Sequence, residues 1–246
     1  LCILNNVGLI KRTSTGGEAT IGVILNNNDG IVQVESGTLS FELLGKNLTD
    51  GTYNVSSGAV LNWESSITLS GELSGQIDGN LNWDNFSSNT VSVSASAALN
   101  FTGSGNVNWV NGTLNGGGVL TNQSILNLNT SGVKVILEDT TLNNSGAINI
   151  AGSGDLFINQ GILNNQTSGV IDMQVDNGNI TRSGGSSNIL NNSGLLKRTT
   201  TAGIARIFVE LNNAGTIEIE TGELIIANTL PFTNEVNGII KGVGTI

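Results

Sequence analysis

The segment "VIDMQVDNGNITR" holds the best candidates for chemistry in this chain. Asp172 and Asp176 fall on one face of a predicted strand, with Gln174 between them and Arg182 a few residues further on. Two carboxylates on one face could bind calcium, and a nearby arginine could remove a proton from a substrate. Ordinary strand alternation, with carboxylates outside and aliphatic residues inside, explains the same pattern, and we give this structural reading precedence.

Three tryptophans recur at related positions and could bind a sugar. Trp63, Trp83 and Trp109 each follow an apolar residue and an asparagine, as Phe101 does. If they face outward, they form a flat platform for glycan rings; if they face inward, they form an aromatic core. Because alternation places them on the same face as the leucines, we favour the core and keep glycan binding by the three tryptophans as the alternative.

The composition excludes several classes of function. The chain carries 9 basic and 19 acidic residues, for a net charge of -10, and its scattered lysines and arginines form no basic face for nucleic acid or an anionic membrane. Cys2 is the single cysteine, so no internal disulfide can form, and no apolar run is long enough to span a bilayer. "GSGDLFI" at Gly152 is similar to a calcium-binding turn but occurs once. We predict no cofactor, with loosely held surface calcium as the alternative.

The elements that position these residues follow from the triplet LNN. It begins at six leucines, three pairs of which are 21 residues apart: Leu4, Leu25, Leu142, Leu163, Leu190 and Leu211. Looser versions fill the middle of the chain, at Leu61, Leu81, Leu99 and Leu120, and the gap from Leu25 to Leu61 fits two short steps through Leu43. A period near 20 residues is typical of a solenoid.

The local pattern predicts strands. In "GTIEIETGELIIA", apolar and polar residues alternate, and Gly, Ser and Asn break the strands every few residues. Stacked hairpins would give no reason for a constant spacing, whereas a parallel β-helix brings equivalent residues back once per coil. The sequence therefore predicts an all-β fold, a parallel β-helix (solenoid) of about a dozen coils of ~20 residues.

In this fold the leucine of each triplet points inward and the asparagines form the corner. Amides at the same corner of successive coils can bond to one another in a ladder. The predicted structural ladder consists of Asn5, Asn26, Asn143, Asn164, Asn191 and Asn212. Residues 4–27 and 190–213 match at 16 of 24 positions, which indicates duplication of a two-coil cassette. Duplication of this kind lengthens a rod.

"LNNAGTIEIETGELIIA" and the closing "NGIIKGVGTI" resemble the repeats of large bacterial surface proteins. These are the filamentous-haemagglutinin-like and autotransporter-passenger-like adhesins. The resemblance implies a right-handed parallel β-helix stalk that is secreted, attached to the cell surface and used for adhesion or as a scaffold. It carries over no catalytic residue, because the chain has no catalytic motif to match.

We therefore expect residues 1–246 to form a single β-helix segment of a longer chain, with a non-enzymatic, extracellular role as a structural or adhesive stalk. The expected partners are other copies of the chain, through uncapped ends, flanking domains of the same chain, or surface glycans. The alternative is a carbohydrate-active β-helix enzyme that resembles polysaccharide lyases, or a tailspike-like glycan binder, acting through Asp172, Asp176 and Arg182.

Overall fold

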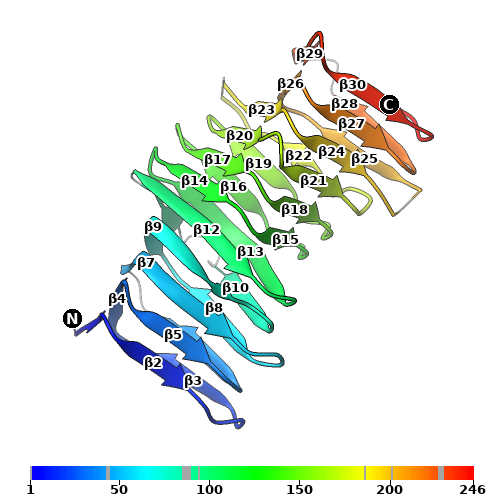
Figure 1. The fold of residues 1–246 in the computed structure, drawn as a ribbon. Helices are drawn as coiled ribbons and strands as arrows, with labels where there is room; N and C mark the ends of the chain where they lie inside the picture. The colour runs from blue at the N-terminus through cyan, green and yellow to red at the C-terminus, as the bar shows by residue number, and fades with distance from the viewer. Residues whose placement is uncertain are drawn as a thin grey trace.

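The computed structural model is a parallel β-solenoid of about ten turns of about 22 residues, with the two termini at opposite ends (Figure 1). It describes residues 2–42, 45–84, 90–93, 95–185, 187–200, 202–226 and 230–246. The predicted fold is confirmed, although the turns are slightly fewer and longer than expected. The described residues contain no helix, and so none that could cross a membrane.

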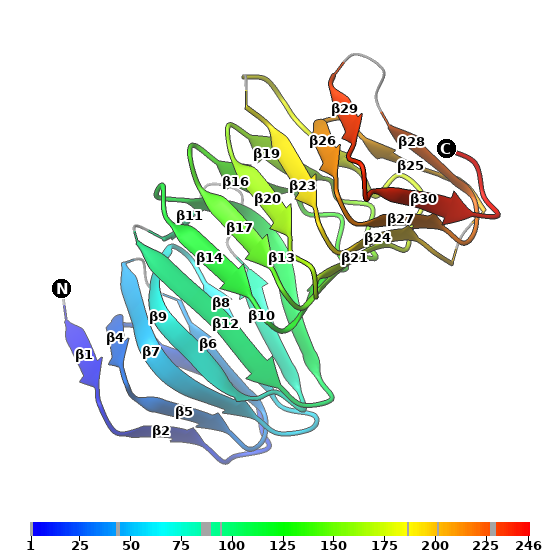
Figure 2. The same ribbon diagram turned by 45° about the horizontal axis from the view of Figure 1, so that its top comes forward.

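Each turn contributes strands to three stacks, in which every strand pairs in parallel with its equivalent in the next turn (Figure 2). The first stack contains β1 (Ile3–Asn6), β4 (Ile24–Asn28), β7 (Lys46–Val55), β9 (Ile67–Gln76), β11 (Thr90–Ser92), β13 (Asn106–Asn115), β16 (Lys134–Leu137), β19 (Leu156–Asn159), β22 (Ile180–Thr181), β25 (Ile204–Ile207) and β28 (Glu223–Ile226). The second contains β2 (Leu9–Arg12), β5 (Ile31–Val34), β7, β9, β12 (Ser96–Thr102), β14 (Val119–Asn122), β17 (Thr141–Asn144), β20 (Ile162–Asn165), β23 (Ile189–Asn192), β26 (Glu210–Asn213) and β29 (Phe232–Asn234). The third contains β3 (Glu18–Ile21), β6 (Thr38–Phe41), β8 (Val60–Glu64), β10 (Asn80–Asp84), β13, β15 (Ile125–Leu128), β18 (Ala147–Ile150), β21 (Val170–Met173), β24 (Leu195–Arg198), β27 (Thr216–Ile219) and β30 (Ile239–Gly242).

Three long strands pass through a corner and belong to two stacks. β7 and β9 join the first stack to the second, and β13 joins the third to the first. In β7 the register to β9 shifts between Thr49 and Gly51, where Asp50 has a positive φ of 41°. A bulge of this kind bends a strand without ending it.

The core is a set of aliphatic columns along the axis. Strands of the middle turns alternate buried and partly exposed residues, as in Ile162–Asn165, so every second side chain is enclosed by the wall. Leu142, Leu163, Leu190 and Leu211 lie directly above one another in the second stack and are buried. This confirms the stacking expected for the triplet leucines, and the parallel pairing excludes the hairpin alternative.

The expectation of one continuous leucine column is wrong. Leu4 and Leu25 lie in the first stack, Leu61 and Leu81 in the third, and the triplet leucines from Leu142 onward in the second. The step from Leu25 to Leu61 and the step from Leu81 to Leu120 each advance by five faces of the wall, one fewer than the six faces of two full turns. Leu43, which we expected to mark one step, lies outside the described residues.

The two copies of the cassette therefore occupy different faces. "ILNN" is β1 in the first stack near the N-terminus and β23 in the second stack near the C-terminus. The following "LIKR" and "LLKR" are β2 in the second stack and β24 in the third. The second copy is displaced around the axis by one face.

Candidate functional site

The first asparagine of each triplet lies on the outside of the wall and bonds to its equivalent in the neighbouring turn. In each case the side-chain Nδ2 of the later turn donates to Oδ1 of the earlier turn. The distances are 2.9 Å from Asn26 to Asn5, 2.9 Å from Asn164 to Asn143, 2.8 Å from Asn191 to Asn164 and 3.0 Å from Asn212 to Asn191. Because the cassette changes face, these residues form two separate outer ladders, one on the first stack and one on the second.

The second asparagine of each triplet forms an inner ladder that sequence analysis missed. It runs unbroken at the corner between the second and third stacks, through Asn122, Asn144, Asn165, Asn192, Asn213 and Asn234, with Nδ2–Oδ1 distances of 2.7–2.8 Å. Asn144 Nδ2 also donates to the Val170 carbonyl of the next turn at 3.0 Å, so each inner amide points toward the C-terminal end. The outer amides point the opposite way.

Glycine follows the inner asparagines at this corner because the turns approach closely there. A Cβ on Gly194 would lie 2.2 Å from the carbonyl oxygens of Gln166 and Gly169, and a Cβ on Gly215 would lie 2.2 Å from that of Gly194. Backbone atoms cannot move aside as a flexible side chain can, so this corner has no room for a side chain. The "NNSG" and "NNAG" repeats carried this signal in the sequence.

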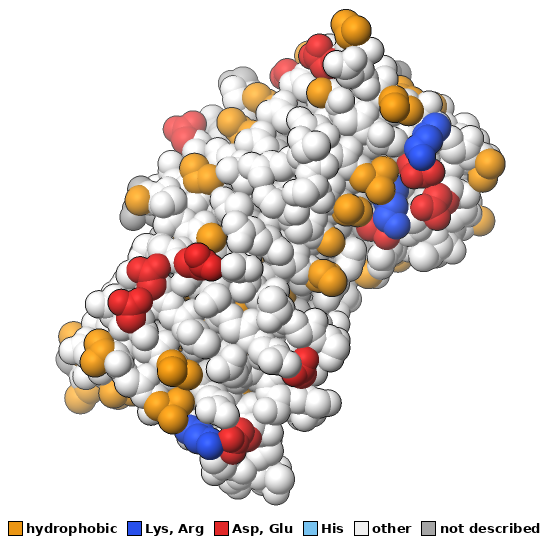
Figure 3. Space-filling view, in the orientation of Figure 1, with side chains coloured by type: hydrophobic (Ala, Val, Ile, Leu, Met, Phe, Trp, Pro, Cys, Tyr) orange, Lys and Arg blue, Asp and Glu red, His pale blue; other side chains and the backbone are white. Residues whose placement is uncertain are grey.

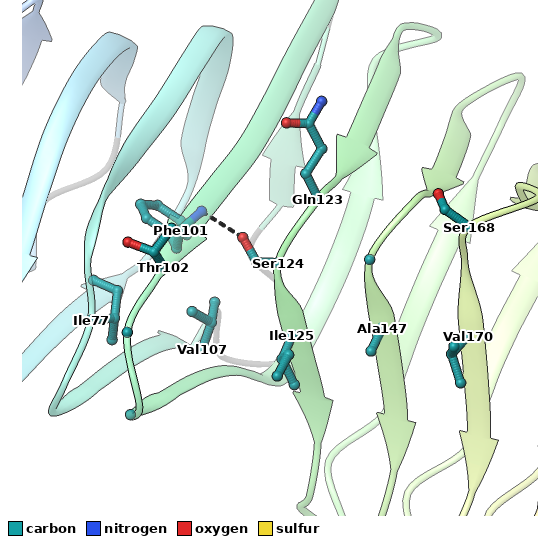
Figure 4. Close-up of a pocket in the computed structure, with 13 residues that line it drawn as sticks. Ile77, Phe101, Thr102, Val107, Gln123, Ser124, Ile125, Ala147, Ser168 and Val170 are labelled. Carbon is teal, nitrogen blue, oxygen red and sulfur yellow. Dashed lines mark hydrogen bonds between the residues drawn. The ribbon is translucent and has the colours of Figure 1, made fainter.

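A groove of about 360 Å³ lies at the same corner, where β12 extends past the shorter β14 (Figure 4). Phe101 and Val107 form part of its floor, and the side chains of Ile125, Ala147 and Val170 line it from three successive turns. Ser124 Oγ accepts the Phe101 N–H at 2.6 Å and donates to the Leu99 carbonyl at 3.1 Å. It thus supplies hydrogen bonds to the part of β12 that extends past the end of β14. The lining of this groove is uncharged.

The alternative of a glycan platform is contradicted by burial. Trp63 and Trp83 are 1% exposed and Trp109 is 0% exposed, because they continue the inward column of the third stack. Trp83 and Trp109 are stacked with ring centroids 4.7 Å apart, and Tyr53 and Phe101 meet Trp63 edge to face. The core interpretation therefore holds, and a sugar cannot reach these rings.

The acidic candidates are engaged by cations of the chain. Asp172 accepts a hydrogen bond from Thr199 Oγ1 at 2.7 Å and lies 3.3 Å from Lys197 Nζ, while Asp176 pairs with the buried Arg198. Arg182, the proton acceptor in the lyase-like alternative, donates to the Gly185 carbonyl at 3.4 Å. Among the described residues, no three His, Cys, Asp or Glu side chains gather closely enough to hold a metal ion.

Two columns of charge lie on the outside of the third stack. Toward the N-terminus, Glu42, Glu64 and Asp84 follow one another in successive turns. Burial raises the pKa of the Glu64 carboxyl, and the nearby carboxylates of Glu18, Glu42 and Asp84 raise it further, while Lys46 opposes them. Toward the C-terminus the column instead alternates in sign, through Asp172, Lys197, Glu218 and Lys241.

Two lysines are buried at turns of the wall, which sequence analysis also missed. Lys46 donates to the Glu64 carbonyl, and Lys134 Nζ donates to the carbonyls of Thr130 at 3.0 Å and Gly132 at 2.6 Å. Desolvation lowers the pKa of each amine to about 8. Through these bonds to backbone carbonyls, each lysine fixes the position of an adjacent loop.

These features define a parallel β-solenoid repeat protein whose described outer surface carries amide ladders, charge columns and an uncharged groove. Comparisons with protein-family models, with curated proteins and with solved structures found no match. The class of the protein therefore stands on its fold, and its function must be argued from its surfaces.

Proposed function

We propose that this chain is a non-enzymatic, extracellular spacer segment of a bacterial surface protein, which holds whatever it is joined to at a fixed distance. The observation that supports the proposal is the continuity of the wall. All three stacks are paired in parallel from the first turn to the last, and the inner amide ladder joins six successive turns without a break. Such a wall resists bending at every turn.

The geometry of the wall explains how a spacer works. Neighbouring strands are about 4.8 Å apart, so about ten turns make a rod about 50 Å long. The backbone hydrogen bonds run along the axis, and the aliphatic columns fill the interior, so adding a turn adds length without changing the cross-section. The right-handed winding expected from the resemblance is part of this proposal, in line with the preference of parallel crossovers.

The location and the partners belong to the same proposal. Few charges, many Asn, Ser and Thr, and no need of a disulfide suit a protein that is secreted and then stands at the cell surface. The exposed aliphatic residues of the first and last turns, such as Leu4 and Ile240, favour contact with flanking domains of the same chain or with other copies.

A combined measurement tests the spacer. Small-angle X-ray scattering of the purified chain should give a stiff rod of about 50 Å whose cross-section is uniform. On cells of the source organism, an antibody against the chain should label the surface, and external protease should remove the label. A compact or bent particle, or a chain protected inside intact cells, would contradict the proposal. Release of unsaturated sugar from polysaccharides would favour the lyase-like alternative.

A further inference from the structure

The C-terminal half of the third stack carries two adjacent columns on its outer face. The first residue of each strand forms a largely apolar column, and the third forms the column of alternating charge. The apolar column is Val170, Leu195, Thr216 and Ile239, and the charged column is Asp172, Lys197, Glu218 and Lys241. Figure 3 shows hydrophobic side chains in a line on this face, beside a cluster of acidic and basic ones toward the C-terminal end.

The order of the charges has a symmetry of its own. Read toward the C-terminus the column is minus, plus, minus, plus; read backward it is plus, minus, plus, minus. Two copies of this column that run side by side in opposite directions therefore meet opposite charges at every turn. Two copies that run in the same direction and in register meet like charges, which disfavours that arrangement.

We propose that this face binds a second copy of the chain, with the two rods antiparallel. A closed dimer requires a two-fold axis, and the charge order permits only an axis perpendicular to the rods. The axis then passes between the turns of Lys197 and Glu218. Lys197 of each copy faces Glu218 of its partner, and Val170 of each faces Ile239 of its partner.

The charge distribution of the whole chain favours this face over others. At a net charge of -10 two copies repel each other, but this column carries two positive and two negative side chains. Asp172 is recessed against Lys197, whereas the side chains of Lys197 and Glu218 are 25% and 27% exposed and can make the central contacts. The acidic column at Glu42, Glu64 and Asp84 lies outside the overlap, because the N-terminal halves project in opposite directions.

The proposal goes beyond the spacer role and can fail without affecting it, because it concerns a lateral face and not the length of the rod. The face covers only four turns, so we expect a weak dimer, of the size class that forms transient contacts. Sedimentation at rising concentration and low salt should show a monomer–dimer equilibrium that weakens as salt screens the charges. A wild-type chain that stays monomeric at the highest soluble concentration would overturn the proposal.

Charge reversal supplies the specific test. Lys197→Glu should raise the dissociation constant about tenfold or more, because both symmetry-related contacts turn repulsive at once. Adding Glu218→Lys should restore dimerisation, since opposite charges then face each other again across the two-fold axis. The matched control is Lys11→Glu, because Lys11 is the equivalent of Lys197 in the other cassette copy but lies on a different stack, 2.7 Å from Glu35. An equal effect of the control, or no rescue by the double variant, would contradict the interface.

Crosslinking tests the orientation. A variant with Val170→Cys and Ile239→Cys, in a Cys2→Ser background, should form a covalent dimer with two disulfides joining position 170 of each chain to position 239 of the other. Within one chain these positions are three turns apart, about 14 Å, which is too far for a disulfide. Disulfides that join 170 to 170, or no crosslink above that of Ile31→Cys in the same background, would rule out the antiparallel arrangement.

Discussion

The two copies of the cassette are nearly the same sequence in two different places of the same wall. In each copy an arginine closes the loop that follows its strand: Arg12 donates to the Gly17 carbonyl at 3.2 Å, and Arg198 donates to the Gly203 carbonyl at 3.3 Å. The local structure is preserved although the copies lie one face apart. A cassette thus encodes strands, corner and loop, while its face is set by the number of strand segments between the copies.

The surroundings of the copies differ, and this difference decides what the shared residues do. Arg198 is fully buried and bonds to Asp176 and to the Met173 carbonyl, whereas Arg12 is half-exposed and bonds to the Gly16 and Gly17 carbonyls at the surface. The charges around the copies differ as well, since the third stack has like charges in the N-terminal half and alternating charges in the C-terminal half.

The largest effect is expected at the arginines. Arg198→Ala should lower the free energy of unfolding by about 3 kcal/mol, because it leaves a cavity and removes the hydrogen-bond donor of buried carbonyls. Arg12→Ala should cost less than about 1 kcal/mol, since water can replace the guanidinium. Urea denaturation followed by circular dichroism measures both. Equal losses would mean that the loop, and not its surroundings, determines how much each arginine contributes to the free energy of unfolding.

A smaller difference is expected in the inner ladder. Asn192→Ala removes an amide that accepts from Asn165 and donates to Asn213, so it should cost about 2 kcal/mol. Its equivalent Asn6 lies in the first turn and bonds to Asn27 at 2.6 Å, and Asn6→Ala should cost about 1 kcal/mol. The same denaturation series compares them, with the outer Asn191→Ala as control. A loss at Asn191 as large as at Asn192 would remove the distinction between inner and outer ladders.

The smallest expected effect is the change in stability when one carboxylate of each charge column is neutralised, and this change has opposite signs in the two halves of the chain. The pKa of Glu64 is raised in the fold, so its contribution to stability is full at acidic pH and is lost as pH rises through that raised pKa. Glu64→Gln cannot ionise, and should stabilise the chain at neutral pH by less than about 1 kcal/mol while making no difference below the ordinary glutamate pKa. Glu218→Gln loses an ion pair with Lys241 at 3.0 Å and should slightly destabilise the chain at neutral pH.

Thermal melts of the two glutamine variants between weakly acidic and neutral pH measure this difference. The wild-type chain serves as the reference at each pH, and added salt should shrink both effects because the carboxylates are near the surface. A Glu64→Gln variant less stable than the wild type at neutral pH would show that the carboxylate column is favourable, against our interpretation.

The sequence predicted the parts of the fold that repeat. The return of leucine and asparagine every 21 residues was enough to predict strands, parallel stacking and the leucine columns, because each is a local pattern repeated at a fixed length. The change of face was not predictable from spacing alone. The steps of 36 residues after Leu25 and 39 after Leu81 look like two short turns, and only the strand pairing shows that each advances five faces where two turns need six.

The surface was predicted less well, because alternation tells inside from outside but not which outer residues become neighbours. The direction in which Trp63, Trp83 and Trp109 point followed from alternation, whereas the partners of Asp172 and Asp176 come from the next turn and depend on its register. The alternating charge column became visible only when that register was known.

The displacement of the second cassette by one face has an evolutionary consequence. A solenoid of this kind need not grow by complete revolutions, because both cassette copies pair in parallel with their neighbours although they lie on different stacks. One duplicated loop can in this way be turned to a new side of the molecule while its own residues stay unchanged. Gene duplication can therefore place a segment on a different face of such a protein as well as lengthen it.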